Sequence, residues 1–322
     1  MSPAPGANLC RALSELNGAD EPLFGGKSAA LGELLNAGVR VPPGFALSCQ
    51  AYAAARAEGA MPAAVREQIE RRYTALANTT GVADPPVAVR SSAVGEDSAN
   101  ATFAGQQETV LWVSGVDEIC AAVTRCWDSL HSETAVSYRA HLGDGREPAM
   151  GVAIQLMVDA TVAGVLFTCN PVTGDPSMVA INASWGLGLA VVGGEVTPDD
   201  YLLSKVTGEI VREQFGFKEV EYLPDLAAHG VALRAVPTER ATARCLDRDA
   251  LQALVEVART AELHFGSHQD VEWAIARTGT LPENLFVVQS RPVTTVQSRA
   301  AAPGADETSA IALVMRRFGA KA

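Results

Sequence analysis

The 322-residue sequence lacks the features that mark membrane-spanning and exported proteins. None of its apolar runs approaches the ~20 residues that a membrane-spanning helix needs. The N-terminal stretch MSPAPGANLCRALSELNGADE has no apolar signal core and carries acidic side chains. We therefore expect a cytoplasmic protein without a membrane partner.

The sequence also lacks an excess of basic residues and any paired-cysteine motif. Its net charge of −12 argues against a nucleic-acid partner, but it is compatible with a small basic pocket for an anion. The chain contains no CxxC pair and no group of histidines, so a zinc centre is not expected. We expect reduced thiols at the six cysteines, which are Cys10, Cys49, Cys120, Cys126, Cys169 and Cys245.

Hydrophobic residues make up 48% of the chain, enough for a large core and, at this length, for more than one lobe. The residue periodicity mixes helices with antiparallel strands, which predicts an α+β fold. We expect helices at 28–37, with Ser28 as its N-cap, and at 61–77, 116–130 and 247–266. We expect strands at 85–93, in two runs within 151–168, and at 270–276 and 285–291, whereas 222–246 looks irregular.

The stretch FGGKS at 24–28 comes just before a predicted helix. It is not a Walker A loop, because that motif needs a glycine five positions before Gly26, where this chain has Glu21. Lys27 and the glycines could still bind an anion, since the N–H groups and the dipole of a helix N-terminus favour phosphate. The alternative is that Lys27 is a solvated first-turn residue.

The stretch VAVRSSAVGEDSANATFAGQQETVL, 87–111, places Arg90 at the end of an apolar strand. A loop of small residues follows, and such a loop could close over a polyanion that the Arg90 guanidinium binds. The alternative is a surface loop in which Arg90 pairs with Glu96 or Asp97.

Two further stretches suggest nucleotide contacts. Gln155 and Met157 share one face of a predicted strand and could border an adenine, although core packing explains the methionine as well. The glycine-containing stretch SWGLG at 184–188 could be a second phosphate loop, but such loops are weak signals by themselves.

The stretch DVEWAIARTGTLPENLFVVQSRP, Asp270 to Pro292, contains the sharpest local pattern. Strand side chains alternate between faces, so pairing Glu272 with Gln289 across a hairpin brings Asp270 beside Arg291. We call these four residues the hairpin patch. Carboxylate and amide oxygens suit Mg²⁺, and a guanidinium suits a phosphate. The alternative is a cross-strand salt bridge on an exposed sheet face.

Several of these stretches together resemble a known family. GGKSAALGELLNAGVRVPPGFALS, VAVRSSAVGEDSANATFAGQQETVLWV, GVLFTCNPVTGD, SWGLG and QDVEWAI…LFVVQSRPV are similar to the N-terminal ATP-binding domain of phosphoenolpyruvate synthase. That domain is shared with pyruvate phosphate dikinase and rifampicin phosphotransferase. The resemblance covers residues 15–296 and implies a two-lobed, ATP-grasp-like fold with an N-terminal lobe at 1–150, a C-terminal lobe at 151–296 and a tail at 297–322.

The resemblance also implies roles for individual residues. Mg²⁺ and ATP would bind in a cleft between the lobes. The residues implied to contact phosphates, and so to catalyse transfer, are Lys27, Arg90 and Arg291. Those implied to hold Mg²⁺ are Glu272 and Gln289, with Asp270 in support. Gln155 and Met157 would border the adenine, and the loop containing Thr102, Gly105 and Gln106 would cover the phosphates.

Full-length members of this family pass phosphate from the ATP domain to a histidine on a swivelling domain and then to an acceptor. The five histidines of this chain are not in the GG-T-SH type of context that such a histidine occupies. The resemblance therefore implies a dikinase-type phosphotransferase subunit whose partner carries the swivelling and acceptor domains, as in phenylphosphate synthase. The alternatives are a self-contained kinase of a small acceptor and a non-catalytic nucleotide-binding module. His268 stands where the family usually has proline, and we interpret it as loop variation.

Overall fold

The computed structural model describes residues 9–95, 108–132, 149–228 and 230–293, and the predicted α+β fold is confirmed. The chain divides into two compact units. Unit 1 consists of Met1–Asn36, Pro42–Met157 and Leu226–Gly230, and unit 2 of Ala37–Val41, Val158–Asp225 and Val231–Ala322. Within the described ranges, no helix is both long and apolar enough to cross a membrane.

Unit 1 contains a five-stranded sheet whose described pairs are all antiparallel. In spatial order its strands are β1 (Cys10–Ala12), β2 (Gly44–Leu47), β5 (Met150–Leu156), β3 (Val87–Ala93) and β4 (Thr109–Val113). Strand β3 is buried along its whole length, as its apolar sequence predicts. This strand carries Arg90 into the interior of the unit.

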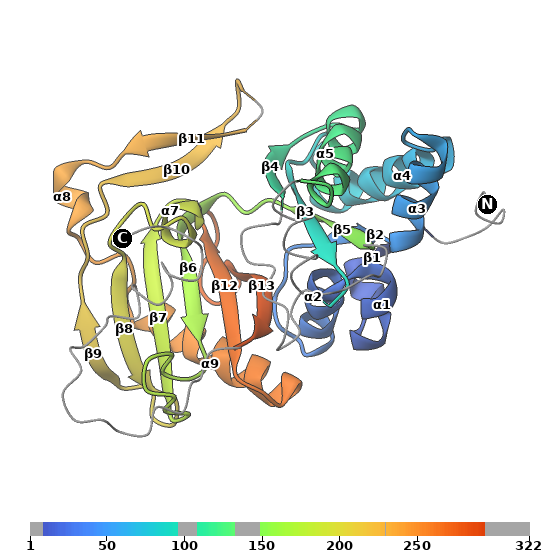
Figure 1. Cartoon of the computed structure of the whole chain (residues 1–322). Coiled ribbons are helices and arrows are strands. Elements are labelled where there is room, and N and C mark those ends of the chain that lie inside the picture. The colour runs from blue at the N-terminus through green and yellow to red at the C-terminus, as the bar shows by residue number, and fades with distance from the viewer. Residues whose placement is uncertain (1–8, 96–107, 133–148, 229, 294–322) are drawn as a thin grey trace. The chain divides into compact units, whose positions relative to one another are not determined.

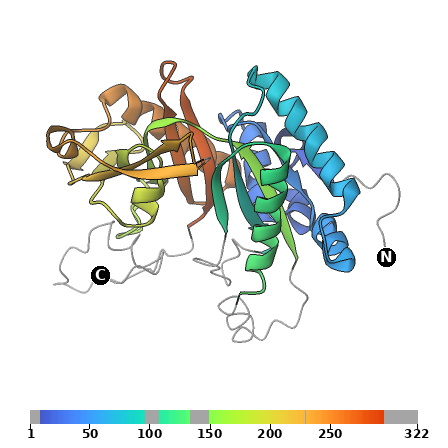
Figure 2. The same ribbon diagram turned by 90° about the horizontal axis from the view of Figure 1, so that it is seen from above.

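Helices cover both faces of this sheet (Figures 1 and 2). On one face, the core is formed with α3 (Cys49–Glu58), α4 (Ala63–Thr80) and α5 (Val116–Ser129). On the other face lie α1 (Glu21–Phe24) and α2 (Gly26–Asn36), which contact β3 and β5 and follow the short 3-10 helices η1 (Leu13–Glu15) and η2 (Gly18–Asp20). Because side chains alternate along β3, Val87 and Val89 face the first helix layer, whereas Arg90 and Ser92 face the second.

Unit 2 contains a six-stranded antiparallel sheet and a separate two-stranded ribbon (Figure 1). The sheet order is β13 (Leu285–Pro292), β12 (Gln269–Ala276), β6 (Ala160–Phe167), β7 (Met178–Trp185), β8 (Asp199–Ser204) and β9 (Ile210–Gln214). The ribbon pairs β10 (Val220–Asp225) with β11 (Gly230–Ala235). The helices are α7 (Leu189–Val192), α8 (Thr238–Ala241) and α9 (Arg248–Phe265).

Helix α9 forms where the sequence predicts it and packs against β6 and β12. The Asp247 side chain caps its start by accepting from the Ala250 N–H at 2.8 Å, and Gly266 ends it in the left-handed region at φ 64°. The apolar side of the helix, with Leu251 and Leu254, is fully buried.

Three sequence-based expectations need correction. Helix α2 starts at Gly26, so Ser28 lies within its first turn instead of capping it. The region 222–246 is not irregular, because it contains most of β10, all of β11 and α8. The two strands within 151–168 exist, but β5 and β6 belong to different sheets. The expected tail at 297–322 lies outside the described residues.

Candidate functional site

The FGGKS stretch packs closely against β3 in unit 1. Gly25 has a φ of +80°, and a Cβ at this position would lie 1.9 Å from the Ser92 carbonyl oxygen, so only glycine fits. The Ser28 N–H donates to Ser92 Oγ at 3.0 Å. Lys27 is only 2% exposed, and its Nζ donates to the Ser91 carbonyl oxygen at 2.8 Å. The alternative of a solvated Lys27 is therefore wrong.

Arg90 lies on the same side of β3 as the start of α2. It pairs with Ala153 of β5 and shares a strand face with Ser92, which contacts the first turn of α2. Arg90 is 9% exposed, so a second cation is buried on this face. Two buried cations beside a helix N-terminus make the face electropositive and suited to a polyanion. Its alternative partners, Glu96 and Asp97, lie outside the described residues.

Gln155 lies on the neighbouring strand and on the same face. It pairs with Ala88, two residues before Arg90, and is 2% exposed. Among the described residues, its Nε2 has no hydrogen-bond acceptor. A buried donor without an acceptor costs roughly 1–3 kcal/mol, so a ligand acceptor such as a base nitrogen would be stabilised here. Met157 follows the end of β5, where its N–H donates to the Pro86 carbonyl oxygen at 2.9 Å.

The hairpin patch forms in unit 2 with the register that the sequence predicts. Asp270 pairs with Arg291 and Glu272 with Gln289, and a bulge follows Glu272. Antiparallel partners place their side chains on the same face, so the four polar groups share one surface of the sheet. The predicted pairing is therefore confirmed.

The patch is not the exposed salt bridge that the alternative described. Asp270 and Gln289 are 5% and 7% exposed, and Glu272 and Arg291 are half-buried. The ion pair itself exists, with Arg291 Nε 3.0 Å from Asp270 Oδ2. Low exposure strengthens such a pair relative to a surface one and holds Arg291 in a fixed direction.

The donor set of the patch fits Mg²⁺ bound together with a phosphate chain. Magnesium takes hard oxygen ligands and usually keeps positions for substrate phosphates and water. Glu272 offers a carboxylate and Gln289 an amide oxygen, while Asp270 holds Arg291. In the part of the chain that the structure describes, no three His, Cys, Asp or Glu side chains gather as a metal site. The fit therefore depends on amide and phosphate oxygens as well as carboxylates.

Three further predicted site residues, Thr102, Gly105 and Gln106, lie outside the described residues. In the SWGLG stretch, two of the amides that a phosphate loop would use are bonded within the fold. The Gly186 N–H donates to the Thr161 carbonyl oxygen at 2.9 Å, and the Leu187 N–H to that of Tyr222 at 2.9 Å.

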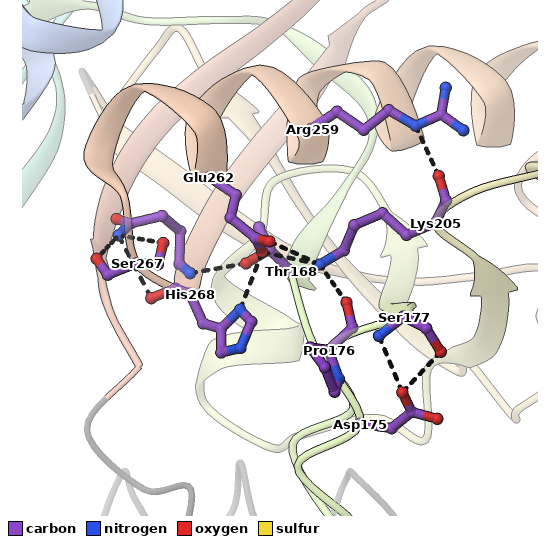
Figure 3. Close-up of polar contacts among 10 residues, drawn as sticks. Thr168, Asp175, Pro176, Ser177, Lys205, Arg259, Glu262, Ser267 and His268 are labelled. Carbon is purple, nitrogen blue, oxygen red and sulfur yellow. Dashed lines mark hydrogen bonds and ion pairs between the residues drawn. The ribbon is translucent and has the colours of Figure 1, made fainter.

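Sequence reasoning missed a polar cluster at the start of β12 (Figure 3). The Glu262 carboxylate of α9 lies 2.9 Å from Lys205 Nζ and 3.0 Å from His268 Nδ1. Burial acts to raise the pKa of Glu262, but hydrogen bonds from Thr168, Lys205 and His268 outweigh it and leave that pKa below its ordinary value. Side chains alternate between the two faces of a strand. The placement of Asp270 on one face of β12 could therefore have indicated that the residues next to it in the sequence face α9.

The comparisons with known proteins show the family of the chain. The model of the pyruvate phosphate dikinase, AMP/ATP-binding domain family matches residues 56–310. The chain belongs to this family. The match includes Arg90, Gln155 and the whole hairpin patch, whereas Lys27 lies before the matched range. Most of both units therefore falls within one family domain.

Curated relatives show the same similarity. A probable phosphoenolpyruvate synthase of Staphylothermus marinus is 36% identical over 87% of this chain and 40% of its own length. The phosphoenolpyruvate synthase of Pyrococcus furiosus is 33% identical over 96% of this chain and 46% of its own length. The prodigiosin synthesizing transferase PigC of Serratia marcescens is 35% identical over 84% of this chain and 32% of its own length. The chain thus spans less than half the length of these relatives.

The solved structure of an L-amino acid ligase from Bacillus licheniformis aligns with 74% of this chain and 47% of its own, at a TM-score of 0.27 and 11% identity. The fold description therefore rests on the sheets of the chain itself.

Proposed function

We propose that this chain is the ATP-binding part of a phosphoenolpyruvate-synthase-like phosphotransferase. Lys27, Arg90 and Gln155 of unit 1 and the hairpin patch of unit 2 bind one Mg·ATP, in an ATP-grasp-like arrangement. Membership of the AMP/ATP-binding family and the buried hairpin patch support this proposal most strongly.

Each group has a defined task in this proposal. Lys27 and Arg90 neutralise phosphate oxygens, and the Gln155 amide donates to the base beside Met157. Glu272 and Gln289 would hold Mg²⁺, which would supply positive charge against the phosphate oxygens. Arg291, oriented by Asp270, stabilises the charge that develops as the phosphoryl group leaves. The protein contributes position and charge without forming a covalent bond itself.

In this proposal, the acceptor is a histidine on a swivelling domain of a partner subunit. The same partner subunit also carries the domain that binds the final acceptor. ATP gives its β-phosphoryl to that histidine, one water is consumed, and AMP and inorganic phosphate are released. The observation behind this step is that the relatives are more than twice as long as the region they share with this chain.

The test uses the full chain with β- or γ-labelled ATP, with and without a candidate partner that carries a phosphohistidine domain. We expect acid-labile label on the partner only from β-labelled ATP, with γ-label released as phosphate and AMP formed. Transfer of γ-label to a small molecule by the chain alone would instead show a self-contained kinase. Nucleotide binding without any product, with the partner present, would show a binding module.

Two variants with matched controls test the site itself. Glu272→Ala and Arg291→Ala should each abolish turnover while circular dichroism stays unchanged, because lost stabilisation of developing charge costs roughly 3–4 kcal/mol. The controls are Glu283→Ala and Arg277→Ala, two exposed or half-exposed positions on the same hairpin. Equal loss in the controls would contradict the assigned roles.

A further inference from the structure

A second polar layer lies beneath the hairpin patch, on the opposite face of the same strands. Gln269 directly precedes Asp270, and Ser290 stands between Gln289 and Arg291. Alternation turns their side chains away from the patch and toward α9. Both are 1% exposed, and Ser290 Oγ donates to Gln269 Oε1 at 3.0 Å. This bond joins the two strands of the hairpin between the site residues.

Thr168 holds Gln269 through both of its backbone groups. The Thr168 N–H donates to the Gln269 carbonyl oxygen at 2.9 Å, and Thr168 Oγ1 accepts from the Gln269 N–H at 2.9 Å. Thr168 is fully buried. The Thr168 side chain also contributes to lowering the pKa of Glu262.

Glu262 in turn is fixed by two further elements (Figure 3). Lys205, at the end of β8, places its Nζ 2.9 Å from each Glu262 oxygen and donates to the Pro176 carbonyl oxygen at 2.6 Å. His268 Nδ1 lies 3.0 Å from Glu262, and the His268 carbonyl oxygen accepts from the Val293 N–H at 2.8 Å. The carboxylate therefore joins α9 to the residue that follows β8 and to the residue that precedes β12.

We propose that Thr168 and Glu262 are positioning residues for metal binding at the hairpin patch. Thr168 fixes the Gln269 backbone and Glu262 fixes the preceding His268, so that the adjacent Asp270–Arg291 pair and Glu272 present their charges in one arrangement. This inference rests on the proposed function, because it assigns a metal to the patch. His268 belongs to this layer as a contact of Glu262.

The decisive pair of variants is Thr168→Val and Thr168→Ser. Valine keeps the volume of threonine but removes the hydroxyl, which leaves the Gln269 N–H without its Thr168 acceptor. Serine keeps the hydroxyl. The control is Thr260→Val on α9, whose hydroxyl bonds only to the Glu256 carbonyl oxygen of its own helix in the described structure, at 2.9 Å.

The measurement is the affinity for Mn²⁺, a paramagnetic probe of the Mg²⁺ site, by electron paramagnetic resonance with AMP-PNP bound to the full chain. Groups that orient metal ligands typically change metal affinity about 10–100-fold, so Thr168→Val should weaken Mn²⁺ binding by about that factor. Thr168→Ser and Thr260→Val should stay within about twofold of the wild type. AMP-PNP affinity in EDTA should be unchanged in all three variants.

Glu262→Gln, with Glu256→Gln as its control, provides a second route. It should weaken Mn²⁺ binding in the same direction as Thr168→Val, because an amide replaces the charge that Lys205 and His268 contact. Wild-type Mn²⁺ affinity in folded Thr168→Val would overturn the positioning role alone. A wild-type chain that binds AMP-PNP but no Mn²⁺ would overturn the metal assignment in the proposed function and this inference with it. Equal losses in Thr168→Ser and Thr168→Val would show that the hydroxyl has no such role.

Discussion

Replacing Lys218 by methionine should cost unit 2 a large part of its stability. Lys218 Nζ and Asp199 Oδ1 form an ion pair in which both side chains are 0% exposed. Asp199 also accepts from the Gly216 N–H at 3.0 Å, the Cys245 N–H at 3.0 Å and the Tyr201 hydroxyl at 3.3 Å. The pair therefore joins β8 to the segments before β10 and before α9. Methionine removes the cation and leaves a buried carboxylate.

The expected magnitude follows from this geometry. Removing one partner of a buried pair typically costs about 3–5 kcal/mol, and the neutral donors that remain on Asp199 favour the lower end, about 3 kcal/mol. A domain of this size loses roughly 2–4 °C in Tm per kcal/mol, so a decrease of about 6–12 °C is expected. That loss is large beside a total stability of about 5–15 kcal/mol.

The assay is thermal and urea unfolding of the full chain followed by tryptophan fluorescence; two of the four tryptophans, Trp185 and Trp273, lie in unit 2. The control is Arg277→Met, which breaks a half-exposed pair with Asp159 at 3.3 Å and should cost at most about 1 kcal/mol. The urea midpoint of Lys218→Met should lie below that of the wild type, while the dependence of the unfolding free energy on urea concentration should stay the same. Equal midpoints for Lys218→Met and Arg277→Met would refute the reasoning.

Three further predictions follow from individual groups. Burial raises the pKa of Cys126 to about 12 and of Cys169 to about 11. Iodoacetamide at pH 8, followed by mass spectrometry, should therefore label both thiols far more slowly in the native chain than in urea. Fast labelling of the native chain would contradict their burial. The pKa of Glu262 lies below its ordinary value of 4.5. The ionised carboxylate therefore stabilises the fold above pH 4.5, and this stabilisation is lost as pH falls through the lowered pKa. Stability of Glu262→Gln should consequently vary less below pH 4.5 than that of the wild type, and parallel curves by thermal denaturation would count against this. Gly25→Ala forces a Cβ to within 1.9 Å of the Ser92 carbonyl oxygen at a φ of +80°, which should cost roughly 1–3 kcal/mol; an unchanged Tm would disprove that close approach.

The hairpin register could be predicted because alternation and one turn determine it. Once Glu272 faces Gln289, the positions of Asp270 and Arg291 follow, and local sequence contains all of this information. Helix α9 was predictable for the same kind of reason, since Asp247 and Gly266 mark its two ends.

Features that depend on tertiary contacts were not predictable. Periodicity identifies β5 and β6 as strands, but it does not state that they enter different sheets. Lysine is rarely buried. The 2% exposure of Lys27 could therefore not be predicted without knowledge of its contact with the Ser91 carbonyl oxygen. Glu262 looks like any polar residue of an amphipathic helix, and only the fold brings it to Thr168 and His268.

The proposed function requires residues from both units to bind one Mg·ATP. Titration calorimetry with Mg·AMP-PNP tests it directly on the wild type, Lys27→Met and Arg291→Ala. The account predicts one site per chain and about tenfold or greater weakening in each variant, because each loses a charge-assisted hydrogen bond. Wild-type affinity in either variant, with the fold intact, would contradict it.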